Sequence, residues 1–424
     1  MSNKDTDAMS KKNDEKPALV PRLRFPDFRD EEGWGSEFGD EVFAQVSNKD
    51  HNSDLPVLAI TQEHGAIPRN LIDYHVSVAD KSIESYKVVE VGDFIISLRS
   101  FQGGIEYSKY HGICSPAYVV LRLKRGHSAD YFRQLLKTDR FIAQLNKNLE
   151  GLRDGKMVSY KQFSELPLPI PSQAEQQKIA DCLSSLDELI TAEGQKLDTL
   201  KAHKKGLMLQ IFPREGETVP RLRFKEFLNE GDWERVSLGD LGTLVSGLTY
   251  SPDDVRDEGL LVLRSSNIKD GRILLDDCVY VDPEIKGANL TKPDDILICV
   301  RNGSSALIGK NAIIPKGMPL CTHGAFMTVF RSECAHFIFQ LFQTPAYQNQ
   351  VAADLGATIN SINGGQLLKY KFFVPKQPEQ TRIVNLLSSL DELVAAQTRK
   401  IDHLKKHKAA LMQQLFPAHD EVLV

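Results

Sequence analysis

The sequence is poor in cysteine and has no long apolar run. Its six cysteines include no C-x-x-C pair, which argues against a disulfide framework and against a thiolate metal site. No apolar stretch approaches the roughly 20 residues that a membrane helix needs. The N-terminal segment is polar and charged, so it is not a signal peptide, and we expect a disordered tail over residues 1–20. These absences are typical of a cytoplasmic protein with reduced thiols.

A large excess of charge of one sign is absent too. The 52 basic and 57 acidic residues give a net charge of −5. This balance argues against a general attraction of the whole chain to nucleic acid, although it leaves room for local basic surfaces. With 41% hydrophobic and 26% charged residues, the composition is that of a globular protein. A length of 424 residues predicts two or three domains.

No complete catalytic motif is present either. Ser115-Pro-Ala-Tyr118 is similar to the Pro-Pro-aromatic motif of amino-methyltransferases, but it lacks the second proline, and the chain has no F-x-G-x-G cofactor loop. The glycine-rich string at residues 303–311 has the wrong spacing for a phosphate loop. Glu284 and Lys286 are spaced like the end of a PD-(E)xK nuclease site, and this nuclease stays as an alternative. We therefore predict no catalytic residue, no metal site and no cofactor for this chain.

The chain does contain a repeated segment of sequence. Residues 171–213 and 375–417 are identical at 24 of 43 positions without a gap. The motif PRLRF also occurs twice, from Pro21 and from Pro220, and each copy is followed by a tryptophan, Trp34 or Trp233. The chain is therefore an internal duplication of a variable region followed by a nearly invariant segment, which predicts a pseudo-two-fold molecule.

The repeated segments have the pattern of two long amphipathic helices. Their apolar residues fall on the a and d positions of a heptad, and the stripes are interrupted at matching places by Glu193 and Lys204 and by Gln397 and Lys408. Because the stripes and their interruptions match, we expect the two helices to pack on each other and to act as a spacer; two unrelated core helices are the alternative. The predicted contact residues are Leu183, Leu186, Ile190, Leu197 and Leu200 in the first helix and Leu387, Leu390, Val394, Ile401 and Leu404 in the second.

Each variable region reads as an α+β domain. Short β-branched runs bounded by glycine, proline and aspartate predict strands. In the first region these runs begin at residues 57, 86, 94 and 117, and in the second they begin at 260, 296, 311 and 326. Short helices are expected at residues 131–145 and 337–352.

Two matched strand ends carry side chains that suit DNA reading. Arg99 and Gln102 follow the first strand end, and Arg301 and Asn302 follow the second, each beside glycine. Arginine can bind guanine with two hydrogen bonds, and glutamine or asparagine can do so with adenine. The alternative is an arginine that only pairs with a neighbouring aspartate.

Basic and polar loops supply the remaining DNA-binding candidates. Residues 121–162 contain ten lysines and arginines against four acidic residues, which favours phosphate contact through Lys147, Arg153 and Lys156. The matching stretch 331–371 is almost neutral, and a solvated helix face remains the alternative. Glycine-flanked loops near residues 151–160 and 356–365 add Ser159, Tyr160, Asn360 and Asn363, because polar loops on a rigid scaffold often bind ligands.

This order of segments resembles the specificity subunits (HsdS) of type I restriction–modification systems. The resemblance rests on the motif EQ-x-x-I-x-x-x-L-S-S-L-D-E-L at residues 175–189 and 379–393, and on the acidic-hydrophobic strand that ends in arginine. It implies an α+β fold of two tandem target recognition domains, separated by two long helices that form an antiparallel coiled coil. The implied boundaries are a tail at 1–20, domains at 21–170 and 220–374, helices at 171–213 and 375–417, a linker at 214–219 and a tail at 418–424.

The resemblance also implies a function. Each domain would read one half of a bipartite, asymmetric double-stranded DNA target. The helices would dock two methyltransferase subunits, and restriction and translocase subunits would join them. Those partners would use S-adenosylmethionine, ATP and Mg²⁺, and the complex would be cytoplasmic. We also expect each repeat to fold by itself. The alternatives are a coiled-coil assembly scaffold that does not read DNA, and the nuclease with Glu284 and Lys286.

Overall fold

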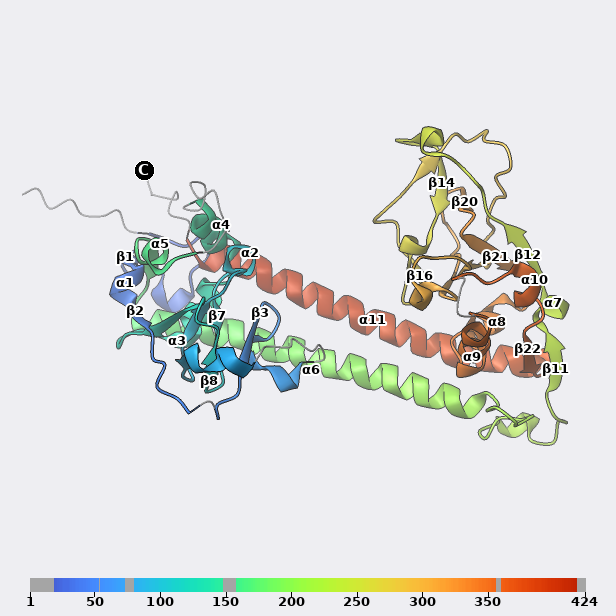
Figure 1. The fold of residues 1–424 in the computed structure, drawn as a ribbon, viewed down its shortest axis with the longest axis horizontal. Helices are drawn as coiled ribbons and strands as arrows, with labels where there is room; N and C mark the ends of the chain where they lie inside the picture. The colour runs from blue at the N-terminus through green and yellow to red at the C-terminus, as the bar shows by residue number, and fades with distance from the viewer. Residues whose placement is uncertain (1–18, 53, 73–79, 148–157, 356–359, 418–424) are drawn as a thin grey trace, which may run out of the picture. The chain divides into compact units, whose positions relative to one another are not determined.

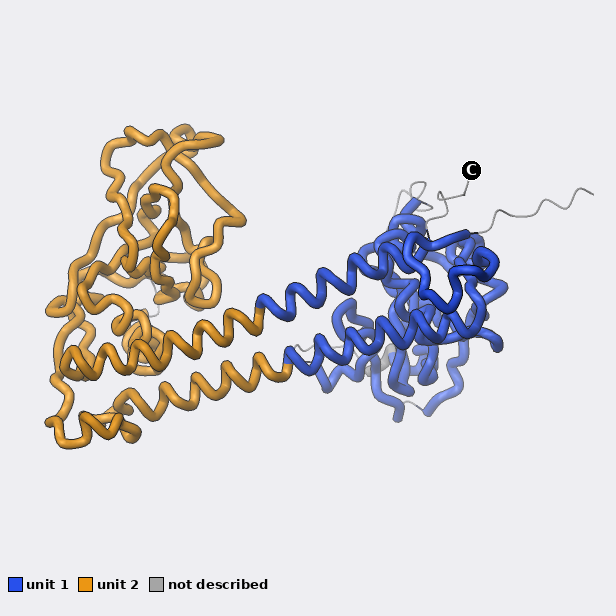
Figure 2. Tube along the Cα trace, turned by 180° about the vertical axis from the view of Figure 1, so that it is seen from behind, with its two compact units in different colours: residues 1–194, 399–424 blue, residues 195–398 orange. Residues whose placement is uncertain are grey.

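A computed structural model of the chain describes residues 19–52, 54–72, 80–147, 158–355 and 360–417. Nearly all of the tail expected at 1–20, and the tail at 418–424, lie outside these ranges. The chain divides into two compact units (Figure 2). Unit 1 comprises residues 1–194 and 399–424, and unit 2 comprises residues 195–398.

Two long helices contribute residues to both units. Helix α6 runs over Gln173–Ile211 and α11 over Gln377–Leu415, with 39 residues each, which is about 58 Å of helix. Each begins three residues after a short strand, β10 (Pro167–Ile170) or β22 (Lys371–Val374). The two predicted helices are therefore confirmed. In the described ranges, neither these helices nor any other carries an apolar segment that could cross a bilayer.

The main sheet of unit 1 has four antiparallel strands (Figure 1). Their order is β2 (Phe43–Val46), β9 (Val119–Leu123), β6 (Phe94–Ile96) and β7 (Glu106–Tyr107). Smaller antiparallel pairs join β1 (Gly35–Phe38) to β10, β3 (Leu58–Thr61) to β4 (Gly65–Pro68), and β5 (Lys87–Val89) to β8 (Gly112–Cys114). The short helices are α1 (Gly39–Val42), α2 (Ser100–Gly103), α3 (Ala129–Leu135), α4 (Asp139–Lys147) and α5 (Tyr160–Ser164).

The main sheet of unit 2 repeats this topology. Its order is β12 (Thr243–Ser246), β21 (Met327–Arg331), β18 (Ile296–Cys299) and β19 (Asn311–Ile313). A second sheet has the order β13 (Val255–Arg256), β17 (Tyr280–Val281), β14 (Leu260–Leu263) and β20 (Cys321–His323), with β14 and β20 parallel. Two pairs remain, β11 (Glu234–Ser237) with β22 and β15 (Ile268–Lys269) with β16 (Arg272–Ile273). The helices are α7 (Leu238–Leu241), α8 (Ala335–Leu341), α9 (Pro345–Asp354) and α10 (Gly364–Leu367).

The short helices differ from the sequence prediction in one respect. The helix expected at 131–145 is two helices, α3 and α4, because the Thr138 hydroxyl donates to Leu135 O at 2.8 Å and accepts from Phe141 N at 3.2 Å. The helix expected at 337–352 is likewise divided into α8 and α9. Here Thr344 donates to Leu341 O, and Pro345 begins α9, where a missing N–H costs nothing.

The cores show that neither repeat is complete alone. The core of unit 1 is built from its sheet and α3, but it also contains Leu415 and Phe416 at the end of α11. The core of unit 2 in turn contains Ile211 and Phe212 at the end of α6, where Phe212 packs edge-on against Trp233. The expectation that each repeat folds by itself is therefore wrong, because each core is completed by the helix of the other repeat.

Candidate nucleic-acid interface

The PRLRF motif joins each variable region to both long helices. In unit 1, the Arg24 guanidinium donates to both carboxylate oxygens of Glu175, at 2.9 and 2.8 Å, near the start of α6. Trp34 Nε1 donates to the same carboxylate at 3.0 Å. Leu23 N donates to Gln414 O near the end of α11. The start of one helix and the end of the other are thus held at one place, so the two helix segments of unit 1 run antiparallel.

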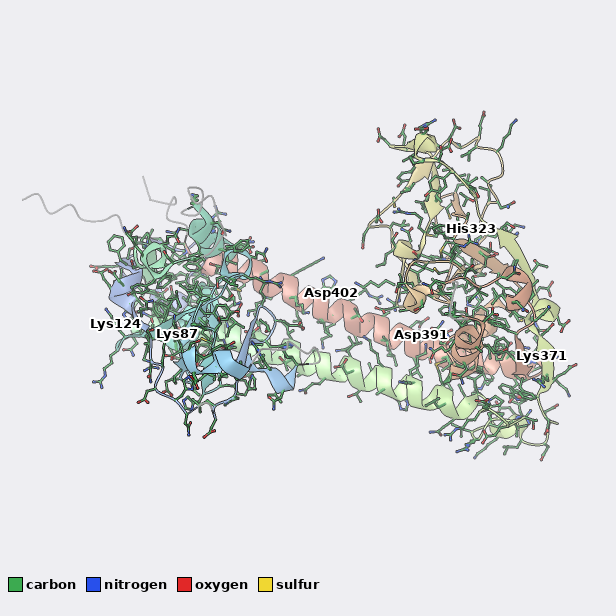
Figure 3. The ribbon with its side chains drawn as sticks, viewed as in Figure 1. Lys87, Lys124, His323, Lys371, Asp391 and Asp402 are labelled. Atoms are coloured by element: carbon green, nitrogen blue, oxygen red, sulfur yellow. The ribbon has the colours of Figure 1, made fainter. Side chains whose placement is uncertain are left out.

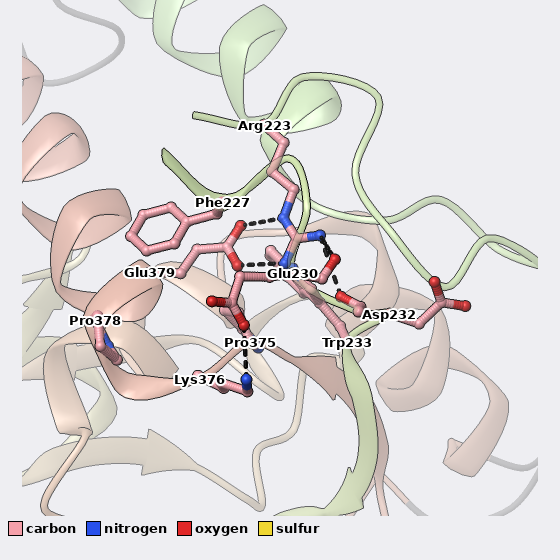
Figure 4. Close-up of a pocket in the computed structure, with 10 residues that line it drawn as sticks. Arg223, Phe227, Glu230, Asp232, Trp233, Pro375, Lys376, Pro378 and Glu379 are labelled. Atoms are coloured by element: carbon pink, nitrogen blue, oxygen red, sulfur yellow. Dashed lines mark hydrogen bonds and ion pairs between the residues drawn. The ribbon is translucent and has the colours of Figure 1, made fainter. Parts of the chain in front are cut away.

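Unit 2 repeats this clamp with one difference (Figure 4). Arg223 donates to both oxygens of Glu379 at the start of α11, and Leu222 N donates to Gln210 O at the end of α6. These hydrogen bonds raise the pKa of Arg223, as they do for the equivalent arginine of unit 1. Trp233 Nε1, however, has no hydrogen-bond partner among the described residues. The sequence alone showed the repeated motif but not its role; the available signal was that the arginine of PRLRF and the glutamate at the start of the helix recur in both repeats.

A second junction connects each variable region to the helices through an aspartate of the LSSLDEL motif. In unit 1, Asp187 accepts hydrogen bonds from Gln134 of α3 at 3.1 Å and from Lys408 of α11 at 2.7 Å. In unit 2, Asp391 accepts from Gln340 of α8 at 3.0 Å and from Lys204 of α6 at 2.6 Å (Figure 3). The lysines that interrupt the apolar stripes are therefore ion-pair partners of these aspartates.

The predicted stripe residues lie on the covered side of the helices. Leu183 and Leu387 are fully buried, and Ile401 is 8% exposed. The other predicted contact residues, Leu186, Ile190, Leu197, Leu200, Leu390, Val394 and Leu404, are half-buried. The antiparallel order is visible in the ion pairs of unit 1, where Asp187 binds Lys408 and Glu193 binds Lys400.

The aspartates at the starts of β6 and β18 have a structural role. Arg122 binds both carboxylate oxygens of Asp93 at 2.8 Å, and Arg331 binds both oxygens of Asp295 at 2.8 Å. These pairs hold neighbouring strands of each main sheet together. Asp93 and Asp295 are thus engaged with Arg122 and Arg331, and within the described ranges neither Arg99 nor Arg301 forms an ion pair with an aspartate.

In unit 2 the two loops that the sequence singled out come together. Arg301 forms an isolated antiparallel bridge with Ser361, and Ile362 N donates to Val300 O at 2.8 Å. The strand end after β18 and the loop before α10 are therefore one surface. Arg301 is exposed there, and its guanidinium carbon lies 5.8 Å from the ring centroid of Phe326. Phe326, which the sequence pattern did not single out, is 58% exposed.

The three asparagines of this surface bind the protein itself. The Asn302 amide donates to Ser265 Oγ at 3.1 Å and accepts from Ser304 N at 3.0 Å. The Asn360 amide donates to Gly303 O at 3.1 Å. Asn363 accepts from Gly365 N at 2.8 Å and caps α10. These contacts fix the loops, so the asparagines shape the surface around Arg301.

The equivalent surface of unit 1 is formed differently. Arg99 and Gln102 are exposed at the start of α2, as expected. Burial raises the pKa of Tyr118, and the charges of Arg69 and Arg99 act in the opposite direction. Ser159 caps α5, and the Tyr160 hydroxyl donates to Phe43 O at 3.3 Å, so both have structural roles.

Much of the basic stretch 121–162 is used inside unit 1. Besides Arg122, Lys137 binds Glu106 and Gly103 O, and Arg140 donates to Phe416 O at 2.8 Å. Burial raises the pKa of Glu106, and the charge of Lys137 opposes this. Lys147 is exposed at the end of α4. Arg153 and Lys156 lie outside the described residues.

The nuclease alternative gains no support from the described residues. Glu284 and Lys286 are both exposed. The described part of the chain contains no group of three or more histidine, cysteine, aspartate or glutamate side chains that could hold a metal ion. The buried His323 of β20 donates through Nε2 to Val245 O at 3.0 Å, within unit 2 (Figure 3).

A family model matches both repeats. The model is described as the type I restriction modification DNA specificity domain, and it matches residues 42–202 and 230–406, well over half of the chain. The chain is 24% identical over 355 residues to the type I restriction enzyme MjaVIII specificity subunit of Methanocaldococcus jannaschii, covering 80% of this chain and 81% of the relative. It is 30% identical over 173 residues to the EcoKI specificity subunit of Escherichia coli K12, covering 38% and 37%.

Solved structures share the fold. The S subunit of a type I restriction–modification system from M. genitalium aligns with a TM-score of 0.54 and 15% identity, over 94% of this chain and 99% of that chain. A chain from a study of complex assembly and conformational transition in a type I restriction–modification system aligns with a TM-score of 0.55 and 17% identity, over 91% and 98%. At these identities the likeness concerns the fold, and it confirms the predicted α+β class with tandem domains and long helices.

Proposed function

Because the chain belongs to the family of type I restriction–modification DNA specificity subunits, we propose that its two variable regions each read one half of a bipartite, asymmetric DNA target. The supporting observation is a shared scaffold with different exposed side chains. Both main sheets have the same strand order, and both units carry the arginine–glutamate clamp. At the ends of the equivalent strands β6 and β18, however, unit 1 exposes Arg99 and Gln102, whereas unit 2 exposes Arg301 beside the half-buried Asn302. Such readers suit two different half-sites.

The outer face of the helices supports the partners that we propose. Leu189 is 41% exposed and Leu393 is 53% exposed, and they occupy the same position of the two repeats. Exposed serine and glutamate residues beside them are also repeated, Ser185 with Glu188 and Ser389 with Glu392. Two equivalent faces with an exposed leucine suit two copies of one protein. These copies are two methyltransferase subunits, and restriction and translocase subunits join the complex.

The chemistry belongs to those partners. S-adenosylmethionine, ATP and Mg²⁺ would bind to the methyltransferase and restriction subunits, and this chain supplies recognition and assembly without catalytic residues of its own. The complex acts on DNA in the cytoplasm. The clamps and junctions described above support this proposal, because there the charged side chains of the helices bind the variable regions and each other.

Methylation mapping tests this proposal. Cells that express the chain with its methyltransferase subunit are expected to carry one modified motif with two specified halves and an unspecified spacer. Exchange of residues 35–170 with residues 234–374, with both helices and both PRLRF clamps kept, should give the two halves in exchanged order. Assembly without any methylated motif would favour the scaffold. Mg²⁺-dependent cleavage by the isolated chain that is lost in Glu284→Gln would favour the nuclease.

A further inference from the structure

Phe326 is a large apolar side chain that unit 2 holds rigidly in solvent. Its carbonyl oxygen accepts hydrogen bonds from Val300 N at 3.0 Å and from Arg301 N at 3.1 Å. The turn before it is closed by Met327 N, which donates to Gly324 O at 2.8 Å. Gly247 packs against this turn so closely that a Cβ there would lie 2.2 Å from Gly324 O. The exposure of the ring is therefore a fixed property of the turn.

The Arg301 guanidinium lies over this ring, and it forms no hydrogen bond with any side chain or carbonyl group of the described residues. Its distance of 5.8 Å from the ring centroid is that of a cation–π contact. Within the described residues it makes no hydrogen bond or ion pair, whereas Arg223 and Arg331 of the same unit each bind a carboxylate with two hydrogen bonds. A planar group with five donors, in contact with a flat ring and exposed to solvent, can bind two acceptors in one plane.

The neighbouring asparagine amides are already engaged in hydrogen bonds within the protein. The amides of Asn302 and Asn360 are engaged with Ser265 and Gly303, as described above. Their hydrogen bonds, together with the bridge between Arg301 and Ser361, hold the segment after β18 that carries Arg301. Among the described residues of this surface, Arg301 therefore presents a planar donor group that is not engaged in hydrogen bonds, on a loop held by these contacts.

We propose that Arg301, oriented by the ring of Phe326, reads a guanine in the half-site recognised by unit 2, and that Phe326 is its positioning residue. This inference rests on the proposed function. In the major groove, guanine offers its O6 and N7 atoms side by side, and an arginine binds both at once. Contact with the ring restricts the guanidinium before DNA binds, so less conformational freedom is lost when the two hydrogen bonds form.

The experiment uses the full chain assembled with its methyltransferase subunits and the target found by methylation mapping. Duplexes are prepared in which each guanine in turn is replaced by 7-deazaguanine, which lacks the N7 acceptor. We expect the wild-type complex to bind one of these duplexes roughly tenfold more weakly, since a bidentate contact discriminates by about this much or more. The Arg301→Ala complex should bind that duplex and the unmodified target equally. Arg301→Lys should also lose the discrimination, although it keeps the charge.

Variants at Phe326 test the positioning role. Phe326→Leu removes the ring but keeps an apolar side chain, and it should reduce the discrimination at the same guanine. Phe326→Tyr keeps the ring and should retain it. Arg235→Ala is the matched control, because Arg235 is an exposed arginine of β11 in the same unit. It removes one positive charge and should weaken binding to all duplexes to a similar degree.

The outcomes separate this inference from the function on which it rests. A complex that binds no duplex with sequence preference would overturn the proposed function. Suppose that the wild-type complex binds its target specifically. If Arg301→Ala then loses affinity at every 7-deazaguanine position at which the wild type does, the inference is wrong. A half-site for unit 2 that contains no guanine would overturn the proposed guanine contact. If Phe326→Leu still discriminates fully between guanine and 7-deazaguanine, Phe326 is not a positioning residue.

Discussion

Lys408 Nζ donates to both carboxylate oxygens of Asp187, at 2.7 and 2.8 Å. The same carboxylate accepts from Gln134 of the first variable region. One aspartate thus connects the first repeat's helix, the second repeat's helix and a reading domain. Asp391 has the same three connections in unit 2 through Lys204 and Gln340. Each copy of LSSLDEL thus supplies the aspartate that connects both helices to the variable region of its unit.

A double-mutant cycle should measure this junction. Asp187→Ala and Lys408→Met are each expected to lower the free energy of unfolding by about 1–2 kcal/mol, because each leaves a partly buried charge without its partner. Their combination should cost less than the sum, with a coupling of about 1 kcal/mol. Urea unfolding of the full chain supplies the numbers. The control combines Lys408→Met with Asp391→Ala; these residues pair with different partners, so additive effects are expected. Coupling in this control would contradict the assigned pairs.

The two arginine–glutamate clamps should differ in strength. Glu175→Gln removes the counter-charge of Arg24, whose side chain is 8% exposed, and it disturbs the hydrogen bond from Trp34. We expect a loss of about 3–5 kcal/mol of stability in unit 1, as for other buried pairs from which one partner is removed. Glu379→Gln should cost about 1 kcal/mol less in unit 2, because Trp233 does not bind that glutamate. Hydrogen exchange of each unit measures both losses, and equal losses would be inconsistent with this difference.

The stability of unit 2 should depend on pH through His323. Burial lowers the pKa of this histidine below its ordinary value of 6.5; its hydrogen bond to Val245 O and the charge of Asp295 oppose this, and Arg331 adds to it. The folded protein therefore binds fewer protons than the unfolded chain between the two pKa values. The contribution is fully present above about pH 6.5 and is lost as the pH falls through the folded pKa, with a slope of at most about 1.4 kcal/mol per pH unit.

His323→Gln is the variant that checks this assignment. Its amide can still donate to Val245 O but does not titrate, so the pH dependence of unit 2 between pH 5 and 7 should become flatter than that of the wild type. Hydrogen exchange within unit 2 at several pH values follows the change. An unchanged slope in the variant would assign the pH dependence to another group.

Periodicity is enough to predict the long helices but not their partners. The predicted ends lie within two residues of the observed ones, because the apolar stripes and flanking prolines define them. Which core receives Leu415 and Phe416 cannot be predicted, since a heptad stripe does not say whether its partner runs parallel or antiparallel. The clamps at Glu175 and Glu379 decide this, and they depend on contacts more than 150 residues apart in the chain.

The candidate reading residues show a similar limit. Arg301 and Asn302 give the same sequence signal, a polar side chain at a strand end beside glycine. The structure separates them, because the Asn302 amide binds Ser265 while the Arg301 guanidinium stays open. The sequence places Phe326 in a strand, since an aromatic residue before Met-Thr-Val is typical of one. Only the turn at Gly324 and its hydrogen bonds place the ring outside the sheet.

The basic residues Lys147, Arg153 and Lys156 should contribute to DNA affinity without sequence preference. Replacement of Lys147, Arg153 and Lys156 by glutamine is expected to weaken binding to any duplex. It should also make the plot of log binding constant against log salt concentration less steep, by roughly one unit of slope for each phosphate that is no longer bound. Binding measured at several salt concentrations gives the slope. Replacement of the exposed helix residues Lys201, Lys205 and Lys406 is the control with equal charge change. If both triple variants keep the wild-type slope, these residues form a solvated surface.

The length of α6 and α11 should determine the spacer between the two half-sites. Both helices contribute residues to both units, and Glu193 faces Lys400 in the antiparallel pair. Insertion of four residues after Gly194 in α6 and after Thr398 in α11 therefore lengthens both helices at matched positions. Four residues add about 6 Å of helix, and base pairs are about 3.4 Å apart. The unspecified spacer should lengthen by about one or two base pairs.

Two controls accompany the four-residue insertion. Insertion in α6 alone should destabilise the chain, because the lysine–aspartate junctions and the clamps at the helix ends cannot then all form. Insertion of two residues in both helices displaces the apolar stripes by about half a turn and should also disrupt the pairing. Methylation mapping of the matched four-residue variant measures the spacer, with both half-sites expected to stay the same. An unchanged spacer in a folded, active variant would show that the helices hold the partners without setting the distance on DNA.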